Sequence, residues 1–171
     1  EGFHDMNFVD EYGPAAYINR ARKEGARDFG ACMSPHTAFL VLQGMETLNL
    51  RMERHVQNTR IIVNFLNSHK SVRSVCYPEL EDHLDYELVK DLLPKGCGAV
   101  FTFQLEGNRE TGKKFIEQLN LFSHLANVGD AKSLVIHPAS TTHHRMSNAA
   151  LKKAGITEST IRLSIGIEDS E

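Results

Sequence analysis

Arg162 is the residue of this sequence whose type and position are best suited to binding a ligand. Apolar and polar side chains alternate along residues 160–168, and this period of two is typical of a half-buried strand. Arg162 is the one large cation in the middle of the polar face. A strand would hold its planar guanidinium so that it could bind a carboxylate through two parallel hydrogen bonds. The pattern alone favours a simpler interpretation, a solvated arginine on an exposed face.

A turn that could hold a small ligand lies earlier in the chain, at Asn127-Val128-Gly129-Asp130 between two short apolar segments. Gly129 can adopt a positive φ and lets backbone N–H groups approach a ligand, while Asn127 and Asp130 offer hydrogen bonds on either side. Most turns of this composition only reverse the chain, so the pattern alone favours that role.

The composition limits the class of protein. With 171 residues, 41% of them hydrophobic, and a net charge of −3, the chain can form one core and is not basic enough to indicate nucleic-acid binding. The three cysteines, Cys32, Cys76 and Cys97, form no CxxC pair, which favours structural thiols in a reducing, cytoplasmic setting. The nine histidines show no HExxH-like spacing, so no metal site is expected. We find no membrane-spanning run or signal pattern and expect a soluble protein.

The expected elements follow from periodicity and capping residues. Residues 1–14 lack periodicity and predict an extended arm, and residues 15–27 have helical composition. Ser34 is suited to cap a helix that starts at Pro35 and, if continuous to Ser68, runs about 50 Å. Beyond it the pattern predicts helices over 83–93, 109–119 and 147–154, strands over 72–77, 99–105 and 160–167, and two short strands flanking the turn. This mixture predicts an α+β fold, an antiparallel or mixed sheet with helices on one face.

Several motifs in a fixed order resemble one enzyme family. From about Gly13 to Asp169 the chain resembles the C-terminal part of the O-acetylhomoserine sulfhydrylases, in the pyridoxal-phosphate-dependent family of cysteine and methionine metabolism. The resemblance implies the small domain of the fold-type I, aspartate-aminotransferase-like architecture. It rests on Ser34-Pro-His-Thr-Ala-Phe-Leu, Gln43-Gly-Met-Glu-Thr-Leu, Leu50-Arg-Met-Glu-Arg-His55, Leu93-Pro-Lys-Gly-Cys-Gly-Ala99, residues 121–143 and Ile161-Arg-Leu-Ser-Ile-Gly-Ile-Glu-Asp169.

The resemblance also implies how the chain is organised. Residues 1–33 would be a linker arm and short helix from the junction with an N-terminal cofactor domain, and residues 34–171 the C-terminal substrate-side domain. The chain begins at Glu1 rather than Met and stops just after a strand, where family members typically continue into a helix, so we expect a fragment.

The cofactor implied by the resemblance is pyridoxal phosphate, which supplies an electron sink for chemistry at the amino-acid substrate. The family holds it on a Schiff-base lysine in a Ser-x-Thr-Lys-like context. None of the nine lysines has that context, and we find no Gly-rich phosphate loop and no aspartate to assign to the pyridinium nitrogen. We therefore expect no catalytic and no cofactor-binding residue in this chain, and no activity from the chain alone.

The substrate side is what remains. By resemblance, Arg162 binds the α-carboxylate of the substrate, and Asn127 and Thr142 lie beside it. Asn127 could instead only shape its turn, and Thr142, with Ser140 and Thr141, could serve as a capping or turn residue. Three further polar residues lie on the predicted long helix: Arg51, Arg54 and His55. We interpret them as salt-bridge formers between domains or subunits, with a solvated helix face as the alternative.

The implied reaction makes homocysteine and acetate from O-acetylhomoserine and sulfide, in methionine biosynthesis. The implied partners are these substrates, the missing N-terminal domain and further copies of the chain, because the family forms tetramers. Two alternatives stay open. A relative such as cystathionine γ-synthase or methionine γ-lyase is disfavoured because cystathionine-handling relatives have Ser-Leu-Gly-Gly where this chain has Asn127-Val-Gly-Asp130. The other is a binding or assembly module without catalysis.

Overall fold

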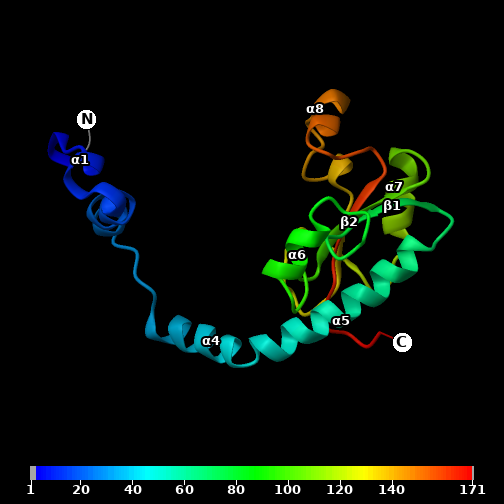
Figure 1. Ribbon diagram of the computed structural model, residues 1–171, viewed down its shortest axis with the longest axis horizontal. Coiled ribbons are helices and arrows are strands. Elements are labelled where there is room, and N and C mark those ends of the chain that lie inside the picture. The colour runs from blue at the N-terminus through cyan, green and yellow to red at the C-terminus, as the bar shows by residue number, and fades with distance from the viewer. Residues whose placement is uncertain (1–2, 171) are drawn as a thin grey trace. The chain divides into compact units, whose positions relative to one another are not determined.

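A computed structural model describes residues 3–170, which divide into two compact units (Figure 1). The first unit ends at Glu46 and the second begins at Thr47. The division lies further along the chain than the boundary at residues 33 and 34 that the resemblance suggests. The two units divide at Thr47 because the expected long helix is interrupted there. The interruption separates α4 (Pro35–Glu46) from α5 (Leu48–Asn67).

The first unit is built of short helical turns before α4. The extended arm expected over residues 1–14 is wrong for the described residues 3–14, and residues 1 and 2 lie outside the described part. Helical structure forms there because Asn7 caps the next turn by accepting a hydrogen bond from the N–H of Val9, and Phe8 is buried. The elements are η1 (Phe3–Asp5), α1 (Phe8–Tyr12), η2 (Gly13–Ala15), α2 (Ala16–Arg20), the π-helical η3 (Ala21–Ala26) and α3 (Arg27–Phe29), so the helix expected over 15–27 is confirmed.

The expected cap of α4 is confirmed, because the Ser34 hydroxyl accepts a hydrogen bond from the N–H of Thr37 at 3.1 Å. Apolar side chains recur along both α4 and α5, but they differ in burial. Val56, Val63 and Leu66 of α5 are buried, whereas the large apolar side chains of α4 are exposed. No helix within residues 3–170 combines the length and the apolar character that crossing a bilayer requires.

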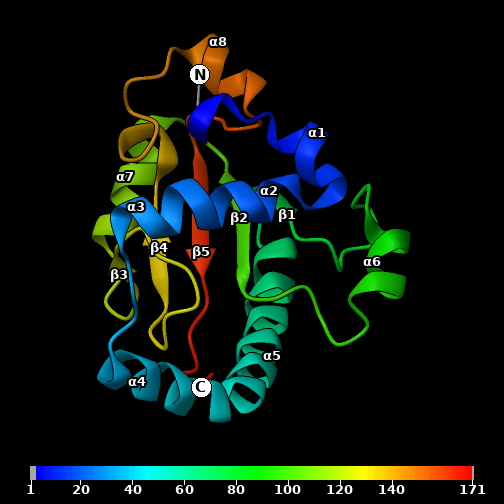
Figure 2. The ribbon, with the colours of Figure 1, turned by 90° about the vertical axis from the view of Figure 1, so that its left-hand side faces the viewer.

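The second unit carries one five-stranded sheet, and the expected α+β fold with a mixed sheet is confirmed. Its strand order is β1-β2-β5-β4-β3, with β5 in the centre (Figure 2). Pairing is antiparallel except between β3 and β4, which run parallel. The strands are β1 (Val72–Cys76), β2 (Val100–Leu105), β3 (Ser123–His124), β4 (Leu134–Ile136) and β5 (Thr160–Ser164).

Helices α5 and α7 (Arg109–Glu117) pack on one face of this sheet. Val63 of α5 and Ile116 of α7 belong to the same buried cluster as Phe101 and Phe103 of β2 and Leu163 of β5. Asn108 and Thr111 form a reciprocal capping box that fixes the start of α7. The remaining elements of this unit are α6 (Tyr86–Leu92), η4 (Pro138–Ser140) and α8 (Asn148–Lys153).

The central strand β5 is more buried than its alternating sequence predicts. Thr160 and Ser164, expected on an open polar face, are 3% and 2% exposed, because a strand in the middle of the sheet has neighbours on both edges. Arg162 is the one residue of β5 that is not buried. Strand β5 therefore carries one partly exposed side chain, the cation Arg162, between residues that are buried.

A set of hydrogen bonds, here called the β5 exit network, fixes the chain where it leaves β5. It comprises His55, Asn58, Ser133, Gly166 and Glu168. The backbone N–H and hydroxyl of Ser133 both donate to the Glu168 carboxylate, at 2.6 and 2.9 Å, and the Ser133 hydroxyl accepts from the N–H of Gly166 at 2.8 Å. These bonds join the end of β5 to the segment that leads into β4.

Helix α5 holds the same segment from the other side. Asn58 donates to the carbonyls of Gly166 and Glu168 at 3.1 and 2.8 Å, and His55 Nδ1 donates to the carbonyl of Ile165 at 2.6 Å. Gly166 has no room for a side chain, because an added Cβ would lie 2.4 Å from the carbonyl oxygen of Ala131. The β5 exit network thus locks α5, β5 and the entry to β4 together.

We expect this protein to self-associate through α4. Phe39, Leu42 and Met45 are 57, 59 and 60% exposed, and their spacing of three residues places them on one side of the helix. An apolar patch of this kind indicates an interaction surface. Sedimentation velocity should show association that increases with concentration and is weakened by Leu42→Lys but not by the control Leu84→Lys, at an exposed loop residue. A monomer at every concentration would contradict this.

We expect Ser133→Ala to lower the free energy of unfolding by about 1–3 kcal/mol, because it leaves the buried N–H of Gly166 without its acceptor and removes one bond to Glu168. Ser123→Ala, at an exposed position of β3, is the matched control and should change stability by less than about 0.5 kcal/mol. Urea unfolding measures both values. Equal destabilisation by the two variants would show that the β5 exit network does not hold β5.

Candidate functional site: Arg162 and the loop before β4

Arg162 lies in the centre of β5, where its Cα pairs with Thr102 of β2 on one side and Ile136 of β4 on the other. Its Nη2 donates a hydrogen bond of 3.3 Å to the backbone carbonyl of Asn127. Within residues 3–170 no carboxylate forms a salt bridge with it. Since a guanidinium has five N–H donors, most of its hydrogen-bonding capacity remains for a ligand.

The loop that carries Asn127 connects β3 to β4 and reaches Arg162 through its backbone. Gly129 has a φ of 72°, so the positive φ expected at this position is confirmed. Asp130 accepts a hydrogen bond from the N–H of Lys132 at 3.0 Å and closes the turn. The side chain of Asn127 is exposed and makes no hydrogen bond within the described part of the chain. Its amide is therefore available beside the guanidinium.

Thr142 lies in the turn that follows η4, and its side chain is exposed. Its hydroxyl is within hydrogen-bond distance of His143 Nδ1, at 2.8 Å. No hydrogen bond joins Thr142 to Arg162 or Asn127 among residues 3–170. The structure thus joins two of the three expected site residues, Arg162 and Asn127, by a hydrogen bond. Ser140 and Thr141 are turn residues, because both donate to the carbonyl of His137.

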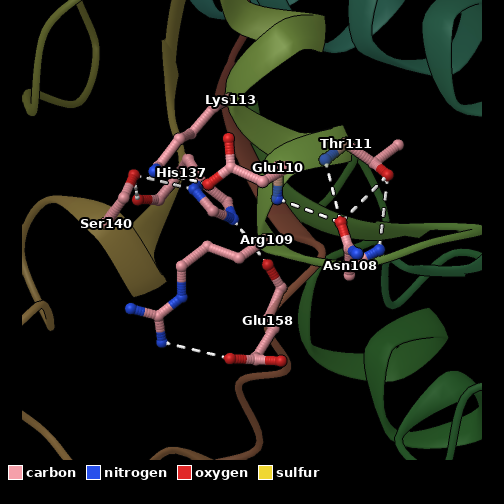
Figure 3. A network of polar contacts seen from close by, with 8 residues as sticks. All are labelled: Asn108, Arg109, Glu110, Thr111, Lys113, His137, Ser140 and Glu158. Atoms are coloured by element: carbon pink, nitrogen blue, oxygen red, sulfur yellow. Dashed lines mark hydrogen bonds and ion pairs between the residues drawn. The ribbon is translucent and has the colours of Figure 1, made fainter.

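His137 anchors the segment that leads to Thr142 (Figure 3). It is 1% exposed and bonded at both ring nitrogens, with Nε2 donating to the carbonyl of Glu158 and Nδ1 facing the Ser140 hydroxyl, each at 2.7 Å. Gly112 of α7 packs directly on the ring, so that an added Cβ would lie 2.6 Å from Nε2. Arg109 pairs with the Glu158 carboxylate at 3.4 Å. These contacts tie α7, η4 and the segment before β5 together.

Burial lowers the pKa of His137, and the positive charges of Arg109 and Lys113 act in the same direction. The hydrogen bond to the Glu158 carbonyl opposes them without reversing the shift. The folded state therefore binds this proton less tightly than the unfolded chain does. Stability linked to His137 is complete above the ordinary histidine pKa of about 6.5. It is lost progressively as the pH falls from that value towards the lower pKa of the folded state.

Sequence reasoning located Arg162 and Asn127 but missed the groups that position them. His55, interpreted as a salt-bridge former or a solvated residue, is neither, because it is 1% exposed and bonded to the carbonyl of Ile165. Two polar residues three positions apart, His55 and Asn58, interrupt the buried side of α5 and were the available signal. Arg54 is exposed, and Arg51 faces the Thr47 hydroxyl at 3.5 Å.

Pyridoxal phosphate, which the resemblance implies, needs a lysine in an enclosed site. None of the nine lysines is buried. Within residues 3–170 no group of three His, Cys, Asp or Glu side chains could hold a metal ion either. Within residues 3–170, therefore, no lysine lies in an enclosed site, and the cation of the candidate site is Arg162.

We expect the free energy of unfolding to decrease as the pH falls from 7 to 5, since His137 must gain a proton on unfolding. His137→Gln should reduce this pH dependence, whereas His124→Gln, at an exposed position of β3, should leave it unchanged. Urea titrations at a series of pH values measure the slope. An identical slope for wild type and His137→Gln would contradict the assignment.

Residues 11–171 match the family described as Cys/Met metabolism PLP-dependent enzyme. The chain is 45% identical over 167 residues to a homocysteine synthase of Schizosaccharomyces pombe, covering 98% of this chain and 39% of that protein. It is 44% identical over 170 residues to O-acetyl-L-homoserine sulfhydrylase 1 of Thermus thermophilus, covering 99% of this chain and 40% of that protein. The chain thus spans about two fifths of the length of these relatives.

Solved structures agree with these sequence matches. The chain superposes on a putative O-acetylhomoserine (thiol)-lyase of Campylobacter jejuni with a TM-score of 0.83 and 42% identity, covering 98% of this chain and 39% of that one. That crystal structure contains N'-pyridoxyl-lysine-5'-monophosphate. An O-acetylhomoserine sulfhydrylase of Wolinella succinogenes gives a TM-score of 0.74 and 32% identity over 95% of this chain. The chain belongs to the PLP-dependent enzyme family of cysteine and methionine metabolism.

Proposed function

We propose that this chain is the substrate-side, C-terminal part of an O-acetylhomoserine sulfhydrylase, which makes homocysteine and acetate from O-acetylhomoserine and sulfide. The proposal is supported by relatives named for this activity at 44% identity and by the fold they share. Pyridoxal phosphate and its lysine would be contributed by an N-terminal domain. The chain alone would then bind an amino acid without converting it.

The observation that carries the proposal is the unpaired guanidinium of Arg162 on a fixed strand. Its Nη2 contacts only the Asn127 carbonyl among the described residues, at 3.3 Å, so two N–H donors remain free to bind an α-carboxylate side by side. Such a contact would orient the substrate for reaction rather than move a proton. The exposed amide of Asn127 would add a hydrogen bond at the edge of the same site. Thr142 stays a further candidate in the proposal, although the described contacts do not join it to Arg162.

Two other functions compete with this one. A cystathionine γ-synthase or methionine γ-lyase would use the same arginine, and the Asn127-Val-Gly-Asp130 turn and the relatives' names weigh against it. A binding or assembly module without catalysis would not need an unpaired arginine at the centre of a sheet. We further propose a cytoplasmic homo-oligomer, consistent with three free cysteines and with the exposed apolar side of α4.

Substitution of Arg162 in the intact enzyme tests the proposal. Arg162→Lys keeps the charge but loses the two-pronged geometry, and Arg162→Ala loses both. We expect the KM for O-acetylhomoserine to rise about 10-fold to 100-fold, while the visible absorbance of the bound cofactor stays unchanged. Steady-state kinetics and absorbance spectra measure the two quantities.

Arg73→Lys is the matched control, because Arg73 is an exposed strand arginine in the same sheet that already pairs with Glu106 at 2.8 Å. It should leave the KM unchanged. Loss of cofactor absorbance in Arg162→Ala with an unchanged KM would contradict the assigned role. Turnover of cystathionine in preference to O-acetylhomoserine would favour the competing enzyme.

A further inference from the structure

A cavity of about 540 Å³ lies in the second unit between the C-terminal end of α5, the β1–β2 edge and α7. Its floor consists of core residues, since Leu66, Phe103 and Leu105 are at most 7% exposed. Phe115 meets Phe103 edge to face with ring centroids 5.7 Å apart. The volume falls within the range of small-molecule sites, about 300–1,000 Å³.

This cavity is separate from the Arg162 site. It opens on the face of the sheet that α5 and α7 cover, the face to which Phe103 of β2 points. Arg162 pairs with Thr102, the neighbouring residue of β2, and successive strand residues point to opposite faces. A ligand in the cavity would therefore not occupy the proposed substrate site.

The polar residues around the cavity donate hydrogen bonds. Lys114 forms no salt bridge within the part of the chain that the structure describes, and none of the described lining residues is acidic. His69 Nδ1 accepts a hydrogen bond from the N–H of Ser71 at 3.2 Å, so the neutral ring carries its proton on Nε2 as a donor. Gln118 adds an amide. The cavity thus combines an apolar floor with an ammonium and neutral donors.

We propose that this cavity binds a small amphiphilic carboxylate, with its aliphatic or aromatic part against Phe65, Val72 and Phe115 and its carboxylate at Lys114 and His69. The apolar lining accounts for the body of the ligand. Lys114 lines the cavity and forms no salt bridge among the described residues, and it accounts for the negative head group. Neither feature belongs to the proposed sulfhydrylase site, so the site would be a second, regulatory or auxiliary one.

Titration of isotope-labelled protein with octanoate below its micellar range tests the proposal by NMR. We expect amide shifts confined to residues 65–72, 103–105 and 111–118, and an affinity for octanoate about fivefold higher than for its neutral analogue octanamide. Lys114→Gln should abolish this preference and leave the affinity for octanamide unchanged, which also shows that the variant is folded.

Lys113→Gln is the matched control. Lys113 is the adjacent lysine, does not line the cavity and pairs with Glu110 at 2.7 Å, where Figure 3 shows its side chain beside that carboxylate. It removes the same charge and should keep the preference for octanoate. Equal affinities for octanoate and octanamide, equal effects of the two lysine variants, shifts that map elsewhere, or no binding would each overturn the proposal.

Discussion

The hydrogen bonds between Ser133 and the Glu168 carboxylate are the constraint on which the rest of the second unit depends. They join two segments 35 residues apart, and Gly166 is held between them without space for a side chain. A charged acceptor placed partly out of water must be paired, and here a backbone N–H and a hydroxyl do so. With the end of β5 fixed in this way, the strand cannot shift relative to β4, and Arg162 keeps its distance from the Asn127 carbonyl.

The central sheet has two faces with different tasks. One face carries the core and is covered by α5 and α7, so its residues contribute to stability through burial. The other face carries Arg162 between two buried residues, Thr160 and Ser164, and the Arg162 side chain is held by its hydrogen bond to the Asn127 carbonyl. A guanidinium held in this manner loses little further conformational entropy when it binds a carboxylate. The packed core on one face of the sheet therefore helps to fix the position of Arg162 for carboxylate binding on the other face.

Local sequence patterns predicted most of the helices and strands, because apolar residues recur with a period of 2 along a half-buried strand and of 3.6 along an amphipathic helix. The five strands and the helices α6, α7 and α8 follow the expected ranges within a few residues. The break at Thr47 and the short helices of residues 3–15 were not predicted, because they depend on single caps and packing contacts. The burial of Thr160 and Ser164 depends on strand order, which no local pattern contains.

The candidate site, too, could be predicted from the sequence only in part. Arg162 was visible in the sequence as a lone cation on a strand, and family resemblance gave it a role. Its contact with Asn127 spans 35 residues, and the bond from His55 to Ile165 spans 110, so neither can be inferred from neighbours in the chain. The network around His137 likewise joins three separate segments, and only the missing side chain at Gly112 hints at it.

The most direct test of the central claim is a crystal structure of the intact enzyme with L-norleucine, an amino acid of similar length that has no leaving group. The account predicts that both carboxylate oxygens of L-norleucine lie about 2.7–2.9 Å from guanidinium nitrogens of Arg162. A carboxylate bound by other residues, with Arg162 facing solvent, would contradict it.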